Sequence, residues 1–207
     1  MKNLLTIKDA QFVLSVPEVS LLPEGELPEF AFLGRSNVGK SSLLNYLANR
    51  KGLANVSKTP GRTRALNLFK ALLLKKENEQ KEERSFVFMD LPGYGYAKLS
   101  LQERGRLSEV LAEYLENRPQ LKLIFHLLDC RHEPTQEDLE ISQMLQRENQ
   151  PFRLVLTKGD KLIASKKKLA INSIAKALHV SPADCILTSV EERMGQEELL
   201  QIIWNLS

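Results

Sequence analysis

The architecture of this chain follows from residues 31–42, which read Ala31-Phe32-Leu33-Gly34-Arg35-Ser36-Asn37-Val38-Gly39-Lys40-Ser41-Ser42. A short apolar run ends at a glycine, and leucines then recur at helical spacing from position 43, which predicts a strand, a loop and a helix. The loop between them matches the pattern Gly-x-x-x-x-Gly-Lys-Ser without a mismatch, and this pattern is typical of a phosphate-binding loop.

Each residue type in this loop suits the binding of phosphate. The glycines let backbone N–H groups point inward at phosphate oxygens, and the helix that follows favours an anion at its N-terminus. Lys40 offers a positive charge to the β- and γ-phosphates of a nucleotide, and the Ser41 hydroxyl can ligate Mg²⁺. The expected phosphate contacts are Gly34, Arg35, Ser36, Asn37, Val38, Gly39, Lys40 and Ser41.

The composition is that of an ordinary globular protein with one core. The chain has 207 residues, of which 43% are hydrophobic and 27% are charged, and no apolar run is long enough to span a membrane. Charges at Lys2, Lys8 and Asp9 interrupt the N-terminus before an apolar signal region could form, so we expect a cytoplasmic protein without a membrane partner, and a monomer. Cys130 and Cys185 fit no zinc or disulfide spacing.

Strands and helices alternate along most of the chain. Apolar and periodic runs predict strands at 31–33, 65–74, 85–90, 121–129, 152–156 and 184–188, with a charged linker over 75–84, and helices at 101–117, 135–149, 165–179 and 196–206. The expected fold class is α/β, with a mostly parallel six-stranded sheet, one antiparallel edge strand and helices on both faces. We expect an N-terminal extension over 1–28, with a short strand at 11–16, and the nucleotide-binding domain over 29–207.

Two further motifs stand at predicted strand ends, where a guanine-nucleotide site needs them. In Asp90-Leu91-Pro92-Gly93, the carboxylate can hold Mg²⁺ through water and the Gly93 N–H can meet the γ-phosphate. In Thr157-Lys158-Gly159-Asp160, the Asp160 carboxylate can accept two hydrogen bonds from guanine that adenine cannot donate, and the lysine can lie across the purine. The shorter Leu187-Thr188-Ser189 can offer a backbone N–H to guanine O6.

The segment after the first helix is basic and lacks periodicity. Thr63 is the favoured threonine for Mg²⁺ and the γ-phosphate and Thr59 is the alternative, while the expected nucleotide contacts here are Gly61, Arg62, Thr63, Arg64 and Ala65. From position 50 to 64 there are five basic residues and no acidic one: Arg50, Lys51, Lys58, Arg62 and Arg64. They either contact RNA phosphates or are simply exposed, and the sequence does not separate these readings.

Hydrolysis is expected to be slow. Many GTPases have a glutamine just after Asp-x-x-Gly to orient water, but here that position is Tyr94, which has no amide. Asn37 either holds a K⁺ ion against the phosphates, which would neutralise charge, or only stabilises the loop.

Taken together, Gly34 to Leu43, Thr59-Pro60-Gly61-Arg62-Thr63, Asp90 to Ala97 and Thr157-Lys158-x-Asp160 resemble the EngB (YihA/YsxC-type) GTPases, and the resemblance covers about residues 7 to 204. It implies a P-loop GTPase that binds GTP and GDP with Mg²⁺ and acts in assembly of the large ribosomal subunit, with a role in normal septation. It also implies Ser41 and Thr63 as Mg²⁺ ligands. With Asp90 from the strand-end motif, these three residues form the expected Mg²⁺ site, and we expect hydrolysis to depend on Lys40, Thr63, Gly93 and Asn37.

This chain departs from the family pattern in two motifs: Gly159 replaces the usual alanine, and Leu187-Thr188-Ser189 replaces the usual Phe-Ser-Ser. The alternative function is a nucleoside-phosphate kinase, which would share the first loop but have no use for Thr157-Lys158-x-Asp160.

Overall fold

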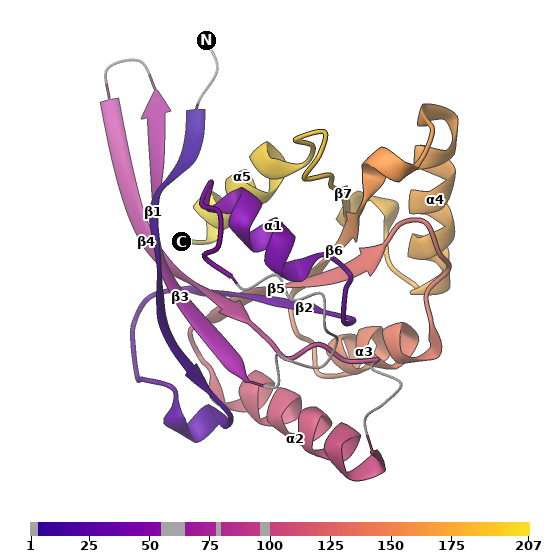
Figure 1. Cartoon of the computed structure of the whole chain (residues 1–207), viewed down its shortest axis with the longest axis horizontal. Helices are drawn as coiled ribbons and strands as arrows, with labels where there is room; N and C mark the ends of the chain where they lie inside the picture. The colour runs from indigo at the N-terminus through magenta and orange to yellow at the C-terminus, as the bar shows by residue number, and fades with distance from the viewer. Residues whose placement is uncertain (1–3, 55–64, 78–79, 96–99) are drawn as a thin grey trace.

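The chain forms a single twisted sheet with helices on both of its faces (Figure 1). This architecture comes from a computed structural model, which describes residues 4–54, 65–77, 80–95 and 100–207. In Figure 1, α1 (Lys40–Leu47) and α5 (Gln196–Leu206) lie above the sheet, whereas α2 (Leu101–Asn117) and α3 (Gln136–Arg147) lie below it. Helix α4 (Ala164–Ala177) packs near the far edge, so the predicted α/β class is confirmed.

The sheet has seven strands in the order β1-β3-β4-β2-β5-β6-β7. Their bounds are β1 Leu4–Val16, β2 Glu29–Gly34, β3 Leu66–Glu77, β4 Gln80–Asp90, β5 Leu121–Asp129, β6 Phe152–Thr157 and β7 Cys185–Leu187. Strands β4, β2, β5, β6 and β7 run parallel, and β3 runs antiparallel to both of its neighbours. The predicted count of six was therefore wrong, because residues 4–16 form a full edge strand, and the antiparallel strand lies second from the edge. The division into an extension and a domain stays a prediction, although β1 belongs to the common sheet.

Strands β3 and β4 form a hairpin that extends further than the predicted strands at 65–74 and 85–90. Residues predicted as a charged linker continue both strands, with Lys75 opposite Glu82 and Leu74 opposite Glu83. Opposite charges facing each other across antiparallel strands stabilise pairing. An ion pair of 2.6 Å from Lys8 on β1 to Glu83 reaches across β3 and ties the three strands together.

Phenylalanines fill the space between the sheet and the α1/α5 layer. Phe32 and Phe88 meet edge to face with ring centroids 5.3 Å apart, and Phe86 and Phe88 do so at 4.8 Å. Edge-to-face contact is a favoured geometry for buried aromatic rings. Trp204 of α5 joins this cluster. The core thus fixes β2 and β4, the two strands whose carboxyl ends carry the phosphate-loop and Asp90 motifs.

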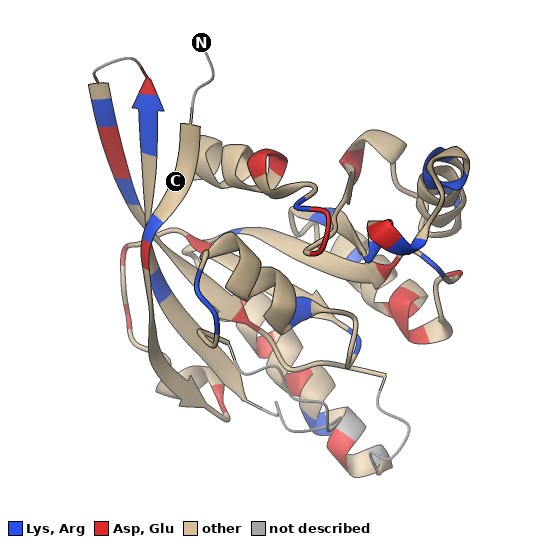
Figure 2. Cartoon of the chain, turned by 45° about the horizontal axis from the view of Figure 1, so that its top comes forward, with Lys and Arg blue, Asp and Glu red and all other residues tan. Residues whose placement is uncertain are grey.

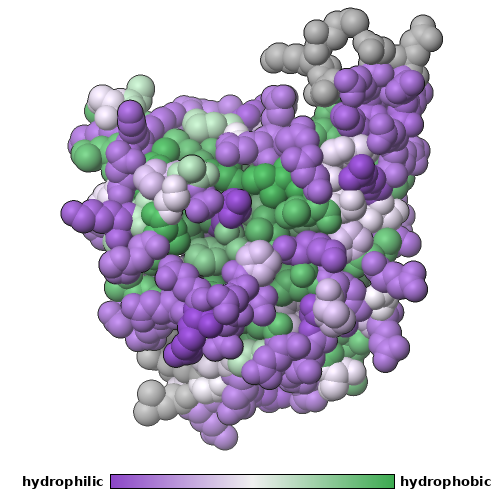
Figure 3. Space-filling view, turned by 180° about the vertical axis from the view of Figure 1, so that it is seen from behind, coloured by the Kyte–Doolittle hydropathy of each residue, from purple (hydrophilic) through white to green (hydrophobic). Residues whose placement is uncertain are grey.

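The helices start where the sequence supplies caps. Ser100 and Thr135 form complete capping boxes with Glu103 and Asp138 at the starts of α2 and α3. Three short 3₁₀ helices connect other elements: Val19–Leu21, Gly159–Lys161 and Pro182–Asp184. Viewed from behind, polar side chains surround a group of apolar ones near the middle of the face (Figure 3). Across the described part of the chain, no helix combines the length and apolar character needed to cross a membrane.

Candidate functional site

The phosphate-binding loop lies at the carboxyl edge of the parallel strands, between β2 and α1. Gly39 and Asn37 both have left-handed backbone conformations, with φ of 110° and 66°. A Cβ atom at Gly34 would come within 2.9 Å of both the Leu127 carbonyl and the Val38 side chain, so only glycine fits there. The loop therefore has the tight, inward-facing backbone that an anion site requires.

Lys40 and Asp90 form a buried ion pair beside this loop. Lys40 is the first residue of α1 and Asp90 is the last residue of β4, and both are more than 90% buried. The second carboxylate oxygen of Asp90 accepts a hydrogen bond of 3.3 Å from the Asn67 amide on β3. The structure thus brings together a cation and a carboxylate that the sequence placed 50 residues apart.

Lys158 is tethered across the top of the loop. Its ammonium group donates to the Asn37 carbonyl at 3.1 Å and to Asp129 at 2.8 Å. Burial opposes the ionisation of Asp129, but hydrogen bonds from Arg131 and Lys158 outweigh it and hold the pKa of Asp129 well below its usual range. The lysine side chain is therefore held extended over the site by a fixed negative charge.

Thr157 stands where many guanine sites have asparagine. Its hydroxyl lies 2.7 Å from the Val38 carbonyl and 3.1 Å from the Leu128 carbonyl, and it can donate to either. A threonine at the end of β6 is thus sufficient to tie the base-side loop to the phosphate loop.

Asp160 follows Lys158 in a short 3₁₀ turn and is oriented by two neighbours. The Ser189 hydroxyl donates to one of its carboxylate oxygens at 2.8 Å, and Lys161 pairs with the other at 2.9 Å. Hydrogen bonds from Lys161 and Ser189 lower the pKa of Asp160. A carboxylate held in this way presents a fixed pair of acceptors at the mouth of the site.

The backbone beneath Asp160 is packed closely. The Gly159 N–H donates to the Thr188 carbonyl at 2.9 Å, and the Thr188 N–H donates to the Leu156 carbonyl at 2.7 Å. A Cβ atom at Gly159 would lie 3.1 Å from the Leu187 side chain, which is a tight contact, so the glycine leaves room for Leu187 in its present position. The structure therefore brings 157–160 and 187–189 together, and their contact with guanine stays a prediction.

The loop after β4 reaches the phosphate loop from the other side. The Ser36 N–H donates to the Tyr94 carbonyl at 3.1 Å, and a Cβ atom at Gly93 would lie 3.3 Å from the Ser36 hydroxyl. The Tyr94 side chain turns toward β5 and α3 and contacts His126 and Asp138. Gly93 is thus adjacent to the phosphate loop, while the side chain that follows it is not presented there.

Several predicted residues fall outside the described part of the chain: Lys58, Thr59, Pro60, Gly61, Arg62, Thr63 and Arg64. Of the five basic residues considered for RNA, only two can be placed. Arg50 donates to the Ala10 carbonyl of β1, so its guanidinium is partly engaged within the protein, and Lys51 is exposed. Elsewhere Lys, Arg, Asp and Glu are interspersed, except that α4 carries lysines and no acidic residue (Figure 2).

Sequence reasoning missed four polar residues that support the site: Asn67, Asp129, His126 and Asp138. Asp129 ends a buried strand at the same sheet edge as Asp90, and this position was a usable signal. Asn67 and Asp138 carry no such signal, because their importance depends on which strand or loop faces them. His126 lies in an apolar strand and is fully buried, which is typical of a structural residue and gives no signal of a role in the site.

Comparison with known proteins gives consistent matches along the chain. The family described as 50S ribosome-binding GTPase matches residues 29–158. The chain is 40% identical over 200 residues to the probable GTP-binding protein EngB of Pelotomaculum thermopropionicum, covering 96% of each chain.

Solved structures match as well. A crystal structure of a probable GTP-binding protein engB aligns with a TM-score of 0.64 at 23% identity, covering 86% of this chain and 97% of that one, which shows the shared fold. Era in complex with MgGDPNP and nucleotides 1506–1542 of 16S ribosomal RNA aligns with a TM-score of 0.64 at 26% identity, covering 88% of this chain and 57% of that one.

Proposed function

The chain belongs to the EngB family of 50S ribosome-binding GTPases, and from this membership we propose that it is a GTP-driven switch in the assembly of the large ribosomal subunit. As a member of this family it binds GTP and GDP and hydrolyses GTP. The kinase alternative therefore falls away. The observation that carries the proposal is the convergence of Lys40, Asp90, Lys158 and Asp160 on one edge of the sheet.

Guanine and phosphate recognition divide between two groups of residues. The N–H groups of residues 34–41 and the Lys40 ammonium bind the phosphates, and the Gly93 N–H meets the γ-phosphate. Asp160 accepts hydrogen bonds from the guanine N1–H and its amine, Lys158 lies along the base, and residues 187–189 border it. This division is supported by the tether from Lys158 to Asn37 and by the Ser189 hydrogen bond that orients Asp160.

Mg²⁺ fits the oxygen groups near the phosphate loop. The Ser41 hydroxyl and the Asp90 carboxylate, acting through water, would hold it together with Thr63, which lies outside the described residues. The metal would neutralise phosphate charge when bound. When nucleotide binds, Lys40 turns from Asp90 to the phosphates, and the carboxylate is freed for the metal shell. The complex of Era, a structural relative, with MgGDPNP supports this assignment.

In this proposal docking to the large ribosomal subunit depends on the nucleotide, because Arg62 and Arg64 are next in sequence to Thr63, the residue proposed to contact Mg²⁺ and the γ-phosphate. Co-sedimentation with large subunits should be stronger with a non-hydrolysable GTP analogue than with GDP, and it should weaken as salt rises. Asp160→Ala, which removes guanine recognition, should abolish the difference between nucleotides. Equal co-sedimentation in both nucleotide states would contradict the switch.

Intrinsic hydrolysis is slow in this proposal, on the order of the 10⁻⁴ s⁻¹ of an unassisted Ras-type site or below. The hydroxyl of Tyr94 is engaged by His126 and Asp138, which supports the view that this side chain does not orient the attacking water.

A K⁺ ion at the Asn37 side chain would supply the missing charge. Asn37 is exposed in the loop and its backbone carbonyl already accepts from Lys158, so the side-chain oxygen is the group left for an ion. Single-turnover hydrolysis in KCl and in NaCl at equal ionic strength tests this, with Asn37→Ala as the control that should lose any K⁺ effect.

We further propose that the protein acts as a cytoplasmic monomer, and that depleting it disturbs septation through defective ribosome assembly.

A further inference from the structure

The hydroxyl of Tyr94 joins three elements that are distant in the sequence. Tyr94 follows Gly93 directly in the loop after β4, and its hydroxyl lies 2.6 Å from His126 Nε2 in the middle of β5. The same hydroxyl donates to Asp138 Oδ1, in the first turn of α3, at 2.7 Å. All three groups are largely shielded from water, so these hydrogen bonds have little competition from solvent.

The direction of each hydrogen bond follows from counting protons. A phenol has one proton, and the Asp138 carboxylate can only accept, so the Tyr94 proton points at Asp138. His126 must then donate its Nε2–H to the phenol oxygen. Its Nδ1 has no hydrogen-bond partner among the described residues, as expected for a neutral ring, and burial lowers the pKa of His126 to about 4. The arrangement therefore has one defined polarity, His126 to Tyr94 to Asp138.

Asp138 connects this hydrogen bond to the start of α3. Its other oxygen, Oδ2, accepts from the Thr135 N–H and hydroxyl, both at 2.9 Å, and completes the capping box. One carboxylate thus supports the helix with one oxygen and Tyr94 with the other. Because capping hydrogen bonds stabilise the start of a helix, the first turn of α3 holds Asp138 in a defined position for its contact with Tyr94.

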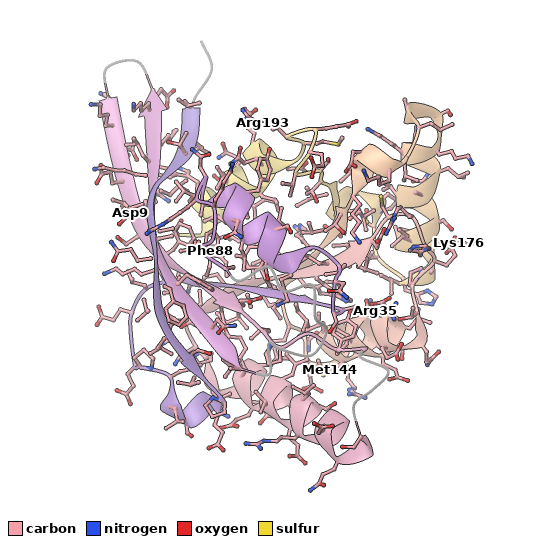
Figure 4. The ribbon with its side chains drawn as sticks, in the orientation of Figure 1. Asp9, Arg35, Phe88, Met144, Lys176 and Arg193 are labelled. Carbon is pink, nitrogen blue, oxygen red and sulfur yellow. The ribbon has the colours of Figure 1, made fainter. Side chains whose placement is uncertain are left out.

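The main chain of Tyr94 contacts the phosphate loop. Its carbonyl accepts from the Ser36 N–H at 3.1 Å, and Arg35 lies over Gly95 so closely that a Cβ atom there would be 2.7 Å from Arg35 Nε. Figure 4 shows Arg35 between the end of β2 and α3. The side chain of Tyr94 therefore joins the loop after β4 to α3, and its backbone joins the same loop to the phosphate loop.

Packing alone does not hold this loop. A cavity of about 370 Å³ borders it, lined also by Leu107 and Leu111 of α2 and by Ile141 and Met144 of α3. Apolar contacts across such a space are incomplete, so they constrain the loop less than a close-packed core would. The hydroxyl contacts of Tyr94 add polar restraints that join the loop to β5 and α3, three residues beyond buried Leu91 and next to Gly93.

We propose that Tyr94 is a positioning residue that anchors the γ-phosphate-sensing loop to α3 and so holds the Gly93 N–H in place for a nucleoside triphosphate. This rests on the proposed contact of Gly93 with the γ-phosphate. A loop that is held beforehand loses less entropy when it binds, so the anchor raises affinity for the triphosphate and leaves the diphosphate unaffected. By linkage, triphosphate binding must in turn stabilise the first turn of α3 by the same factor.

The test compares Tyr94→Phe with Tyr114→Phe. Tyr114 is also buried and donates to a buried carboxylate, Glu29, at 2.9 Å, but Glu29 begins β2 at the opposite end of that strand. Both variants remove one hydroxyl from one buried carboxylate, but Tyr94→Phe also leaves the His126 Nε2–H without its acceptor, so it should lose more stability, and the comparison is made on the ratio of the two nucleotide affinities. The affinities for GDP and for an imido GTP analogue are measured for each, together with amide hydrogen exchange over residues 135–140 in both nucleotide states.

Tyr94→Phe should lower affinity for the GTP analogue by about tenfold, leave GDP within about twofold, and remove the analogue-dependent protection of residues 135–140. Tyr114→Phe should change none of these ratios. His126→Gln, which keeps an N–H donor, should retain the analogue-to-GDP ratio, and His126→Leu should reduce it, which gives a second reading if Tyr94→Phe does not fold.

An unchanged ratio in both Tyr94→Phe and His126→Leu would overturn the proposal. Equal exchange of residues 135–140 with GDP and analogue in the unaltered protein would also overturn it, even though guanine nucleotides bind. Failure of the unaltered protein to bind the GTP analogue would instead contradict the proposed function.

Discussion

Replacing Asp160 by asparagine should change the base that the site prefers from guanine to xanthine. Guanine presents two donors, the N1–H and the amine at C2, and a carboxylate accepts from both. Xanthine keeps the N1–H but has a carbonyl oxygen at C2. An asparagine amide, with one acceptor and one donor, matches xanthine and mismatches guanine.

The surroundings of Asp160 determine which way the new amide points. The Ser189 hydroxyl donates to Oδ1, so the amide oxygen stays there and the NH₂ group takes the place of Oδ2, and the exposed Lys161 ammonium, which pairs with Oδ2 in the unaltered protein, turns to solvent. Guanine then loses one charge-assisted hydrogen bond and meets a donor instead. At 10% exposure the side chain is shielded from water, so the loss should be about 3 kcal/mol, or more than 100-fold in affinity.

The assay is displacement of a fluorescent GDP analogue by GDP and by xanthosine diphosphate. Asp160→Asn should bind GDP more than 100-fold less tightly than the unaltered protein and should bind the xanthine nucleotide more tightly than GDP. Asp184→Asn is the matched control, because Asp184 is a more exposed carboxylate whose partner is Arg153, at 3.2 Å. If Asp160→Asn still prefers guanine, Asp160 does not read the base.

Three other changes have defined outcomes. Lys158→Met should weaken GDP binding about tenfold, measured by calorimetry, because the tether to Asp129 and Asn37 is lost; unchanged binding would remove that tether from the site. Arg118→Leu should lower the free energy of unfolding by about 3–5 kcal/mol in urea titrations, because it leaves Glu29 buried without its cation; a loss below about 1 kcal/mol would contradict this. The pKa of His126 falls from 6.5 to about 4 on folding, so stability should decline as pH drops from about 6.5 to 4, and His126→Gln should flatten that part of the profile.

The sequence predicted the parts of the fold that depend on local patterns. The bounds of α2, β5 and α5 were predicted without error, because each has strong apolar periodicity and a clear flanking signal such as Ser100 or Gly195. The phosphate loop and the strand-end motifs were predicted to lie together because parallel strands end at one edge of a sheet.

The predictions that were wrong or incomplete concern contacts between segments that are remote in the sequence. Residues 75–84 were predicted as a linker because charge is usually a loop signal, but Lys75 and Glu82 face each other across the hairpin. β1 was underestimated because its pairing with β3 is invisible locally. The anchoring role of Tyr94 was missed for a similar reason, since His126 and Asp138 are 32 and 44 residues away.

The charges of the site are compensated within the protein itself. Lys40 and Asp90 are both buried, and a buried charge without a partner costs several kcal/mol, so each requires the other. Asp129 compensates the charge of Lys158. Lys161 compensates the charge of Asp160, and the Ser189 hydroxyl donates a hydrogen bond to the same carboxylate. Binding of a magnesium nucleotide would therefore exchange partners at Lys40 and Asp90 and would not introduce uncompensated charge. Such an exchange would link the presence of phosphate to the end of β4, and Gly93 and Tyr94 stand three and four residues beyond that end, so the segment proposed to respond to the γ-phosphate begins where the ion pair would be broken.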